Sequence, residues 1–284
     1  MSSSTPPTGP PTTTSALVFS DEPRGGARAY MVVNVNPLTG ERDRNFDIAE
    51  KPVVVENLRG QEHLHTLDNS GFQLGYHPAS HKAFLGDEDI VQEYYPESVE
   101  LLKKVTGASK VVIFDHTIRR RRPGQLDSDE SKRQPVAQTH VDQTPSASIA
   151  RVHRHLPPSE APSLLQRRFQ IINLWRPINH SAVDWPLALC DYRSIDPKGD
   201  VFPVTLVFQH REGETFRVKY NPDQKWKYFY GVTPEEYILI KCFDSLQDGS
   251  VALYTPHTGF DDSTTPPGTP FRESIELRAL VFYD

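Results

Sequence analysis

Short strand-like runs, broken again and again by proline and glycine, constrain this chain most. These runs are rich in Val, Ile, Phe and Tyr and end at Gly, Pro, Asn or Asp, a pattern typical of β-strands joined by turns. Proline provides 25 of the 284 residues, about 9% against roughly 5% on average, which disfavours long helices. We predict strands at 29–36, 52–56, 71–76, 110–116, 135–141, 169–175, 201–209, 215–220, 225–230, 237–243, 250–254 and 271–282.

Few segments predict helices. Residues 96–106 begin with a proline in the first turn, carry one apolar face and stop at Gly107. Residues 145–156 and 159–168 are further candidates. About a dozen strands with few helices predict a mainly β fold built as a double-sheet barrel or jelly roll. No strand is followed by a Gly-rich turn that opens a helix, which excludes Rossmann and P-loop folds.

The chain divides into a tail and one domain. Residues 1–16 are dominated by Ser, Thr and Pro, so we expect a flexible tail followed by a single domain over 17–284. A length of 284 residues is ordinary for one β-rich domain. Residues 119–134 and 261–270 are predicted irregular; the charged first stretch is either a solvated loop or a lid near a site.

Charge and cysteine content limit the partners and the compartment. The formal net charge of −6 offers no basic excess, so nucleic acid is not an expected partner. Cys190 and Cys242 lie in apolar stretches, as expected of reduced, buried thiols. With no apolar run of roughly 18 residues and no secretory pattern, we expect a cytoplasmic protein without a membrane partner. The sequence leaves the oligomeric state open.

The strongest chemical signal begins at His140-Val141-Asp142. On a strand, side chains two apart share a face, so an imidazole and a carboxylate point the same way. A second histidine would complete a 2-His-1-carboxylate triad for Fe(II). The alternative is an exposed strand end. A rival pair, His210 and Glu212, lies in a charged hairpin turn and is expected to be structural.

Downstream residues extend this signal. His257 follows Asp142 by 115 positions (257 − 142), and Arg272 and Ser274 begin about 15 positions later (272 − 257). The last two share a strand face, where a guanidinium and a hydroxyl suit the distal carboxylate of a dicarboxylic co-substrate. The alternative is an edge strand with solvated charges. The order HxD, distant His, RxS matches that of Fe(II)/2-oxoglutarate oxygenases.

Longer stretches carry a family resemblance. FQIINLWRPINHSAVDWPLALCDYRSID, PEEYILIKCFDS, PHTGF and FRESIELRALVF resemble the fungal and bacterial hydroxylase/desaturases, which include a gibberellin desaturase, an aspergillic-acid hydroxylase and a component of cephem 7α-methoxylation. The resemblance implies a double-stranded β-helix (cupin-like jelly roll) oxygenase. It would use Fe(II), 2-oxoglutarate and O₂ to hydroxylate or desaturate a small secondary metabolite, releasing succinate and CO₂.

The resemblance also assigns residues. His140, Asp142 and His257 would be the metal ligands and the catalytic centre, and Arg272 with Ser274 would bind 2-oxoglutarate. Arg278 shares the face of Arg272, so it is the alternative anchor.

Three further residues are candidates for substrate binding. Arg176 would line the pocket mouth or contact an acidic substrate; the alternative is a structural pairing with Asp184 or Asp191. Arg119 ends a strand that would reach the same cavity, and Phe260 would form part of its wall.

Two other classes of function remain open. A non-catalytic β-barrel, such as a binding protein or partner subunit, would retain no metal. A cupin-type enzyme without 2-oxoglutarate would bind metal but leave Arg272 and Ser274 without a role.

Overall fold

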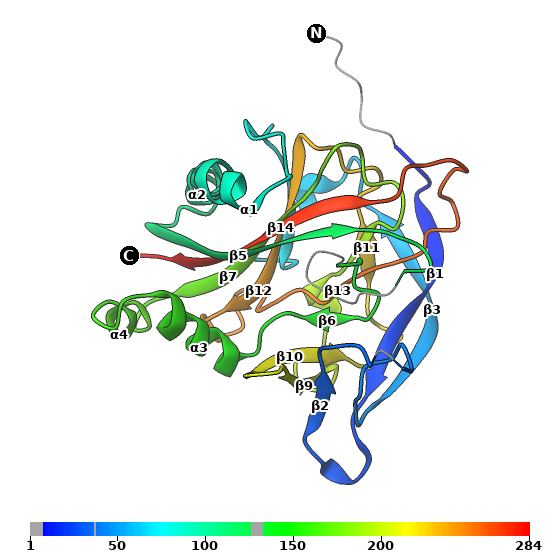
Figure 1. The fold of residues 1–284 in the computed structure, drawn as a ribbon, viewed down its shortest axis with the longest axis horizontal. Helices are drawn as coiled ribbons and strands as arrows, with labels where there is room; N and C mark the ends of the chain where they lie inside the picture. The colour runs from blue at the N-terminus through cyan, green and yellow to red at the C-terminus, as the bar shows by residue number, and fades with distance from the viewer. Residues whose placement is uncertain (1–7, 37, 126–132) are drawn as a thin grey trace.

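The computed structural model describes residues 8–36, 38–125 and 133–284. Within these ranges the chain forms two β-sheets, a large sheet of nine strands and a small sheet of five (Figure 1). In spatial order the large sheet contains β1 (Thr12–Asp21), β3 (Asp47–Asn57), β11 (Trp226–Tyr228), β8 (Leu187–Cys190), β13 (His257–Gly259), β6 (His140–Val141), β10 (Glu212–Val218), β9 (Val201–Val207) and β2 (Ala29–Val32). The small sheet contains β4 (Phe72–Tyr76), β12 (Glu236–Asp244), β7 (Phe169–Pro177), β14 (Glu273–Phe282) and β5 (Lys110–Arg120).

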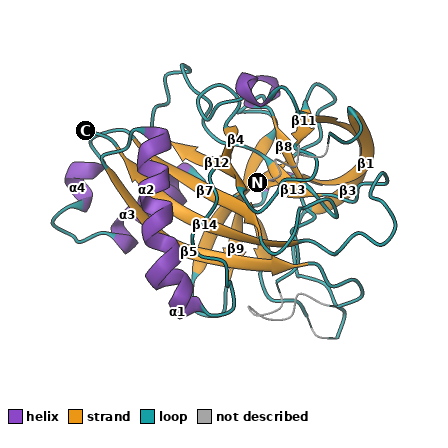
Figure 2. Ribbon diagram, turned by 90° about the horizontal axis from the view of Figure 1, so that it is seen from above, coloured by secondary structure: helices purple, strands orange, loops and turns teal. Residues whose placement is uncertain are grey.

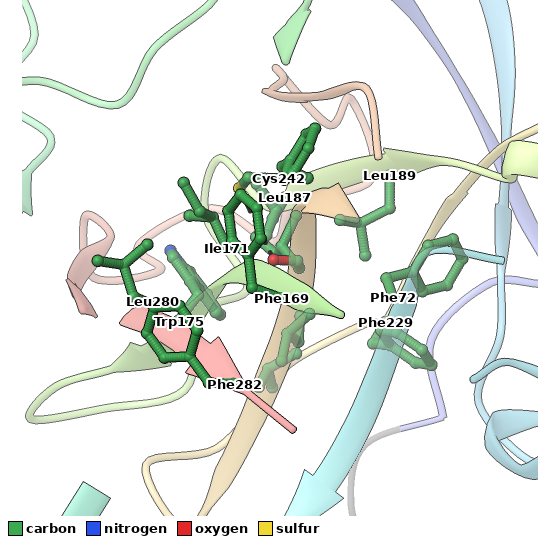
Figure 3. Packing of buried hydrophobic residues seen from close by; sticks show 14 of the residues in the cluster. Phe72, Phe169, Ile171, Trp175, Leu187, Leu189, Phe229, Cys242, Leu280 and Phe282 are labelled. Atoms are coloured by element: carbon green, nitrogen blue, oxygen red, sulfur yellow. Dashed lines mark hydrogen bonds between the residues drawn. The ribbon is translucent and has the colours of Figure 1, made fainter. Parts of the chain in front are cut away.

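The central strands of the small sheet are buried on both faces. Every residue of β7 and β12 is buried, which explains why their sequences are nearly continuous apolar runs rather than alternating ones. Ile171 and Trp175 belong to the core cluster that also contains Leu189 of the large sheet (Figure 3). Ile172 and Leu174 of the same strand belong to a different cluster, with the residues of α2.

Helices cover the outside of the small sheet. Figure 2 shows α2 (Tyr95–Thr106) lying across it, with Leu101 and Leu102 buried. As predicted, α2 has a proline in its first turn and stops at Gly107, whose φ of 73° ends the helix. The other α-helices are α1 (Asp87–Asp89), α3 (Pro145–His155) and α4 (Ala161–Leu164), and a π-helical turn, η3 (Ile90–Tyr94), precedes α2. In the described ranges no helix has the length and apolar character needed to cross a membrane.

The predicted tail is partly structured, which corrects one expectation. Residues 12–16 are part of β1, which pairs with β3 along its whole length, from Thr12 opposite Glu56 to Asp21 opposite Asp47. Burial alternates along the strand, so hydroxyl side chains fill inward positions where the sequence pattern expected apolar ones. Residues 1–7 lie outside the described residues.

The mainly β prediction agrees with the structure, but several strands differ from their predicted positions. β1, β8 and β13 were not predicted, and the predicted strand at 250–254 is irregular. The second and third predicted helices correspond to α3 and to the four-residue α4. Part of the predicted irregular stretch at 119–134 falls on residues 126–132, outside the described residues.

Candidate metal centre

Two histidines and one aspartate from distant parts of the chain meet on the large sheet. His140 lies on β6, Asp142 follows that strand, and His257 begins β13, directly opposite His140 in the strand pairing. One potential ligand atom from each residue lies within 4.8 Å of the others. His140 Nε2 is 3.3 Å from Asp142 Oδ1, and the two imidazole centroids are 4.4 Å apart. Strand pairing therefore brings together three residues that lie far apart in the sequence.

Backbone carbonyls fix which nitrogen of each imidazole faces the group. Nδ1 of His140 lies 2.8 Å from the Gln138 carbonyl oxygen, and Nδ1 of His257 lies 3.0 Å from that of Thr255. Because a carbonyl only accepts hydrogen bonds, Nδ1 carries the proton in both rings. The Nε2 lone pairs are left to serve as ligands, which is the arrangement found around metal-binding histidines.

Asp142 is oriented and kept ionised by its neighbours. Asn173 Nδ2 donates a 2.6 Å hydrogen bond to its Oδ2, and Arg278 Nε lies 3.7 Å from the same oxygen. Burial acts to raise the pKa of Asp142, but the adjacent His140, His257 and Arg278 outweigh burial and hold the pKa well below its ordinary value. The site therefore presents an anionic oxygen.

Burial lowers the pKa of His257, whereas it acts to raise that of Asp142. The nearby His140 lowers the pKa of His257 further. A neutral imidazole is the form that coordinates a metal.

The role of Asn173 was missed in the sequence. It is a fully buried amide within the otherwise apolar stretch IINLW of β7. A polar residue within such a stretch indicates a buried hydrogen-bond partner, and that signal was available. Its partner was not, because Asp142 is 31 positions away.

Arg278 has its donors engaged beside the metal centre. Its Nη1 donates to Thr117 Oγ1 at 2.9 Å and approaches Asp115 Oδ1 at 3.4 Å, and its Nη2 donates to Glu276 Oε1 at 2.8 Å. Asp115, Asp142 and Glu276 therefore compensate the positive charge of Arg278 beside the proposed metal centre.

Arg272 is differently placed. It is 2% exposed, its Nη1 donates to the Trp185 carbonyl at 2.6 Å, and its backbone N–H donates to Asp184. Its buried Nε has no partner among the described residues. Burial and then the nearby charge of Arg119 lower the pKa of Arg272 to about 9. A buried cation beside a half-buried one forms a setting suited to an anion.

Trp185 links this cationic region to the triad. Its ring packs so closely on Gly259, two residues after His257, that a Cβ there would lie 2.8 Å from the indole. Its own backbone is strained at φ 48°, and its buried Nε1 has no partner in the described part of the chain. Arg121 stacks over the ring and pairs with Asp184.

Of the three residues predicted to bind substrate, only Arg119 lies beside Arg272. It stands opposite Ser274 in the pairing of β5 with β14, and its Nη1 donates to the Gln134 carbonyl at 2.9 Å. Ser274 is 1% exposed. Burial lowers the pKa of Arg119.

Arg176 and Phe260 lie elsewhere. Arg176 is buried, with its donors taken by Tyr94 and by two backbone carbonyls. It pairs with neither of the aspartates that the sequence offered. Phe260 packs edge-on against Tyr228 in a separate core cluster. The structure therefore gives both residues a place in the packing.

The rival pair does not build a site. His210 and Glu212 lie exposed around the turn between β9 and β10. The triad is the one set of three or more His, Cys, Asp or Glu side chains with metal-binding spacing in the described ranges. Both cysteines are free and buried, as predicted.

This chain is similar to known proteins in sequence and in structure. Residues 17–282 match the family described as Oxidoreductase/YMDC permease-like domain. The chain is 35% identical to the hydroxylase/desaturase efuI of Hormonema carpetanum, covering 82% of this chain and 84% of that protein. It is 30% identical to the Fe(II)/2-oxoglutarate-dependent dioxygenase nvfI of Aspergillus novofumigatus, covering 92% and 94%. A solved structure titled iron and alpha-ketoglutarate-dependent endoperoxidase NvfI superimposes with a TM-score of 0.83 at 29% identity, covering 96% of this chain and 98% of that one.

Proposed function

The chain belongs to the family of Fe(II)/2-oxoglutarate-dependent hydroxylase/desaturases, and from that premise we propose that His140, Asp142 and His257 hold the iron while Arg272 and Ser274 hold 2-oxoglutarate. The protein is an oxygenase with a jelly-roll fold that uses Fe(II), 2-oxoglutarate and O₂ on a small molecule of secondary metabolism. The observation that carries the assignment is the convergence of the three side chains within 4.8 Å.

The donor set fits Fe(II). Two imidazole Nε2 atoms and one carboxylate are the ligands of the facial triad, which leaves coordination positions open for a co-substrate and O₂. Both imidazoles are already held in the ligating tautomer by carbonyls, and Asn173 orients the carboxylate. The chain's own contribution is this orientation, which is required for affinity as well as for activity.

The surroundings of Arg272 fit a dicarboxylate. Among the described residues, the buried Nε of Arg272 and the buried indole N–H of Trp185 have no partner, and the half-buried guanidinium of Arg119 lies nearby. These features favour an anion there. Arg278 is a weaker candidate for the anchor because Glu276, Asp115 and Asp142 already compensate its charge.

Bound iron with 2-oxoglutarate supplies the oxidation of a substrate C–H bond by O₂, with release of succinate and CO₂. The protein's part is to bind, orient and exclude water. Trp185 on Gly259 and the apolar core between the sheets close the centre on two sides. Whether the product is hydroxylated or desaturated depends on how the substrate is held.

The two other classes account for fewer observations. A barrel without catalysis has no use for two histidines held in the ligating tautomer, and a cupin enzyme without 2-oxoglutarate has no use for the buried cations at Arg272. We further propose a cytosolic enzyme that acts without nucleic acid or membrane, in keeping with its net charge of −6.

An anaerobic titration tests the assignment. Fe(II) and 2-oxoglutarate added together should give a visible chelate absorption band with the parent protein. His140→Ala should abolish the band, and also succinate release when O₂ is then admitted, because one ligand is lost. His210→Ala is the matched control, since it removes an exposed histidine of the rival pair and should change neither. A band of full intensity in His140→Ala would contradict the assignment of these three residues as the metal ligands.

A further inference from the structure

A surface pocket opens beside the proposed metal centre. It has a volume of about 310 Å³ and lies where α3 meets the hairpin of β9 and β10. Asp142 forms part of its wall, so the pocket leads to one of the proposed iron ligands. Its size is at the lower end of the range for sites that bind small organic ligands.

Four arginines and three carboxylates line this pocket. Arg151 and Arg154 come from α3, Arg211 from the hairpin, and Arg28 from the segment before β2. None of the first three has a carboxylate oxygen within 4.0 Å among the described residues. A cluster of unpaired cations is unexpected in a chain with a net charge of −6, and it attracts anions.

The acids in the wall do not neutralise these three arginines. Asp142 belongs to the proposed iron site. Glu214 accepts hydrogen bonds from Thr144 and Ser146 and lies 3.9 Å from Arg28. Glu212 is exposed at the rim. The cations on α3 are therefore free to meet a ligand.

Aromatic rings hold two of the guanidiniums in place. Arg151 lies over Phe114 with 5.2 Å from Cζ to the ring centroid, and Arg211 lies over Phe208 at 3.8 Å. Stacking fixes the guanidinium plane and leaves its N–H edge to bind a carboxylate. Ala147, Ala150, Leu206 and Phe208 supply apolar wall.

We propose that this pocket takes the organic substrate, and that the substrate is a small apolar molecule carrying a carboxylate held by Arg151, Arg154 and Arg211. The proposal rests on the proposed function, since it places the apolar part of that substrate toward Asp142. 2-Oxoglutarate is not the ligand meant here, because its anchor is assigned to Arg272 on a different strand.

Binding of matched acids and esters tests this. The probes are 4-phenylbutyrate and 1-naphthaleneacetate, each with its methyl ester, titrated into the anaerobic Fe(II)·2-oxoglutarate protein and followed by calorimetry and ligand NMR. The acids should bind roughly tenfold more tightly than the esters, as expected for charge-assisted hydrogen bonds. That preference should shrink as salt is added.

Arginine variants test whether these side chains cause the preference for acids over esters. Arg151→Gln with Arg154→Gln should abolish it, and Arg211→Gln alone should reduce it. Arg154 and Arg211 are exposed, so their changes should leave the fold intact. Arg151 is half-buried over Phe114, so thermal unfolding of the double variant checks its fold. Lys103→Gln removes a cation from α2, outside the pocket, and should keep the preference.

The outcomes separate the two proposals. Equal binding of acid and ester, or a preference unchanged in the arginine variants, overturns this inference even when the chelate band forms normally. If the band fails to form, the function proposed above fails; the acid preference is then measured on the metal-free protein, where its presence still supports an acid-binding pocket and its absence rejects one. The 2-oxoglutarate affinity should be unchanged in Arg154→Gln; a large loss would reassign the cluster to the co-substrate.

Discussion

At the scale of single residues, Arg278 lies on β14 and Arg272 directly precedes that strand, and the two differ in their surroundings. Arg278 is compensated by Glu276, Asp115 and Asp142. Arg272 has a backbone carbonyl and a half-buried cation beside it, and its Nε has no partner among the described residues. The sequence could not separate them, because the predicted strand over 271–282 places both on one face. The charges contributed by other strands make the difference.

These surroundings predict different defects. Arg272→Leu should weaken 2-oxoglutarate binding by roughly 10- to 100-fold, the value of a charge-assisted carboxylate contact, and leave Fe(II) affinity nearly unchanged. Arg278→Leu should leave 2-oxoglutarate binding nearly unchanged, because three acids already compensate its charge. Anaerobic titrations of each ligand measure both. The reverse pattern would make Arg278 the anchor.

A third arginine predicts a gain in stability. Arg217 on β10 is 5% exposed, and its Nη2 donates a hydrogen bond to Met31 Sδ at 3.4 Å. Its Nε has no partner within the described residues. Burial and then the charges of Arg42 and Arg44 lower its pKa to about 10. Among the described residues it has no ion pair, so Arg217→Met should raise the free energy of unfolding by about 1–3 kcal/mol. Urea denaturation would measure this; a loss of stability would contradict it.

At the scale of elements, the close packing of the chain just before β4 against residues 254–255 depends on Gly71. Gly71 has φ +87°, and a Cβ there would lie 2.5 Å from Thr255 Oγ1 and 2.8 Å from the Tyr254 carbonyl oxygen. Gly71→Ala should therefore cost both backbone strain and a clash with main chain, roughly 3 kcal/mol or more.

A second glycine separates these two costs. Gly107 ends α2 at φ +73° with nothing within 4 Å of an added Cβ, so Gly107→Ala should cost only about 1 kcal/mol. Thermal and urea unfolding of both variants give the comparison. Equal losses would mean that the clash at Gly71 relaxes without cost.

The elements that could be predicted are those with a strong local pattern. β7, β12 and β14 are long apolar runs, and α2 has a proline start and a glycine end. β8 and β13 have four and three residues, too few for a pattern, and exist because neighbouring strands supply their hydrogen bonds. β1 begins with threonines and a serine, so composition alone predicted a tail.

At the scale of the whole molecule, acid should destabilise the fold through a buried histidine. His65 is 5% exposed, stacks on Phe72 and bonds Ser70 through Nδ1. Burial lowers its pKa, an effect that Asp191 only partly opposes. The folded state then binds this proton more weakly than the unfolded state does, so stability falls as pH drops below about 6.5, toward the folded pKa.

Two neighbouring histidines test this. His65→Gln should flatten part of the decline in unfolding free energy between about pH 7 and pH 5. His63→Gln, which removes an exposed histidine two residues away, should keep the parent profile. Denaturation at a series of pH values measures both, and identical profiles for the two variants would contradict the role of His65.

By itself, the sequence determined the mainly β character, the helix that covers the small sheet, and the residue types of the proposed iron site in their chain order. Those features are local: alternation, apolar runs, a two-residue spacing, proline and glycine at element ends. Only the tertiary structure decided that His257 stands opposite His140, that Asn173 holds Asp142, and that Arg176 serves the packing. Such contacts depend on strand pairing across tens to more than a hundred residues, where charge, burial and hydrogen bonding come from side chains that no local pattern places.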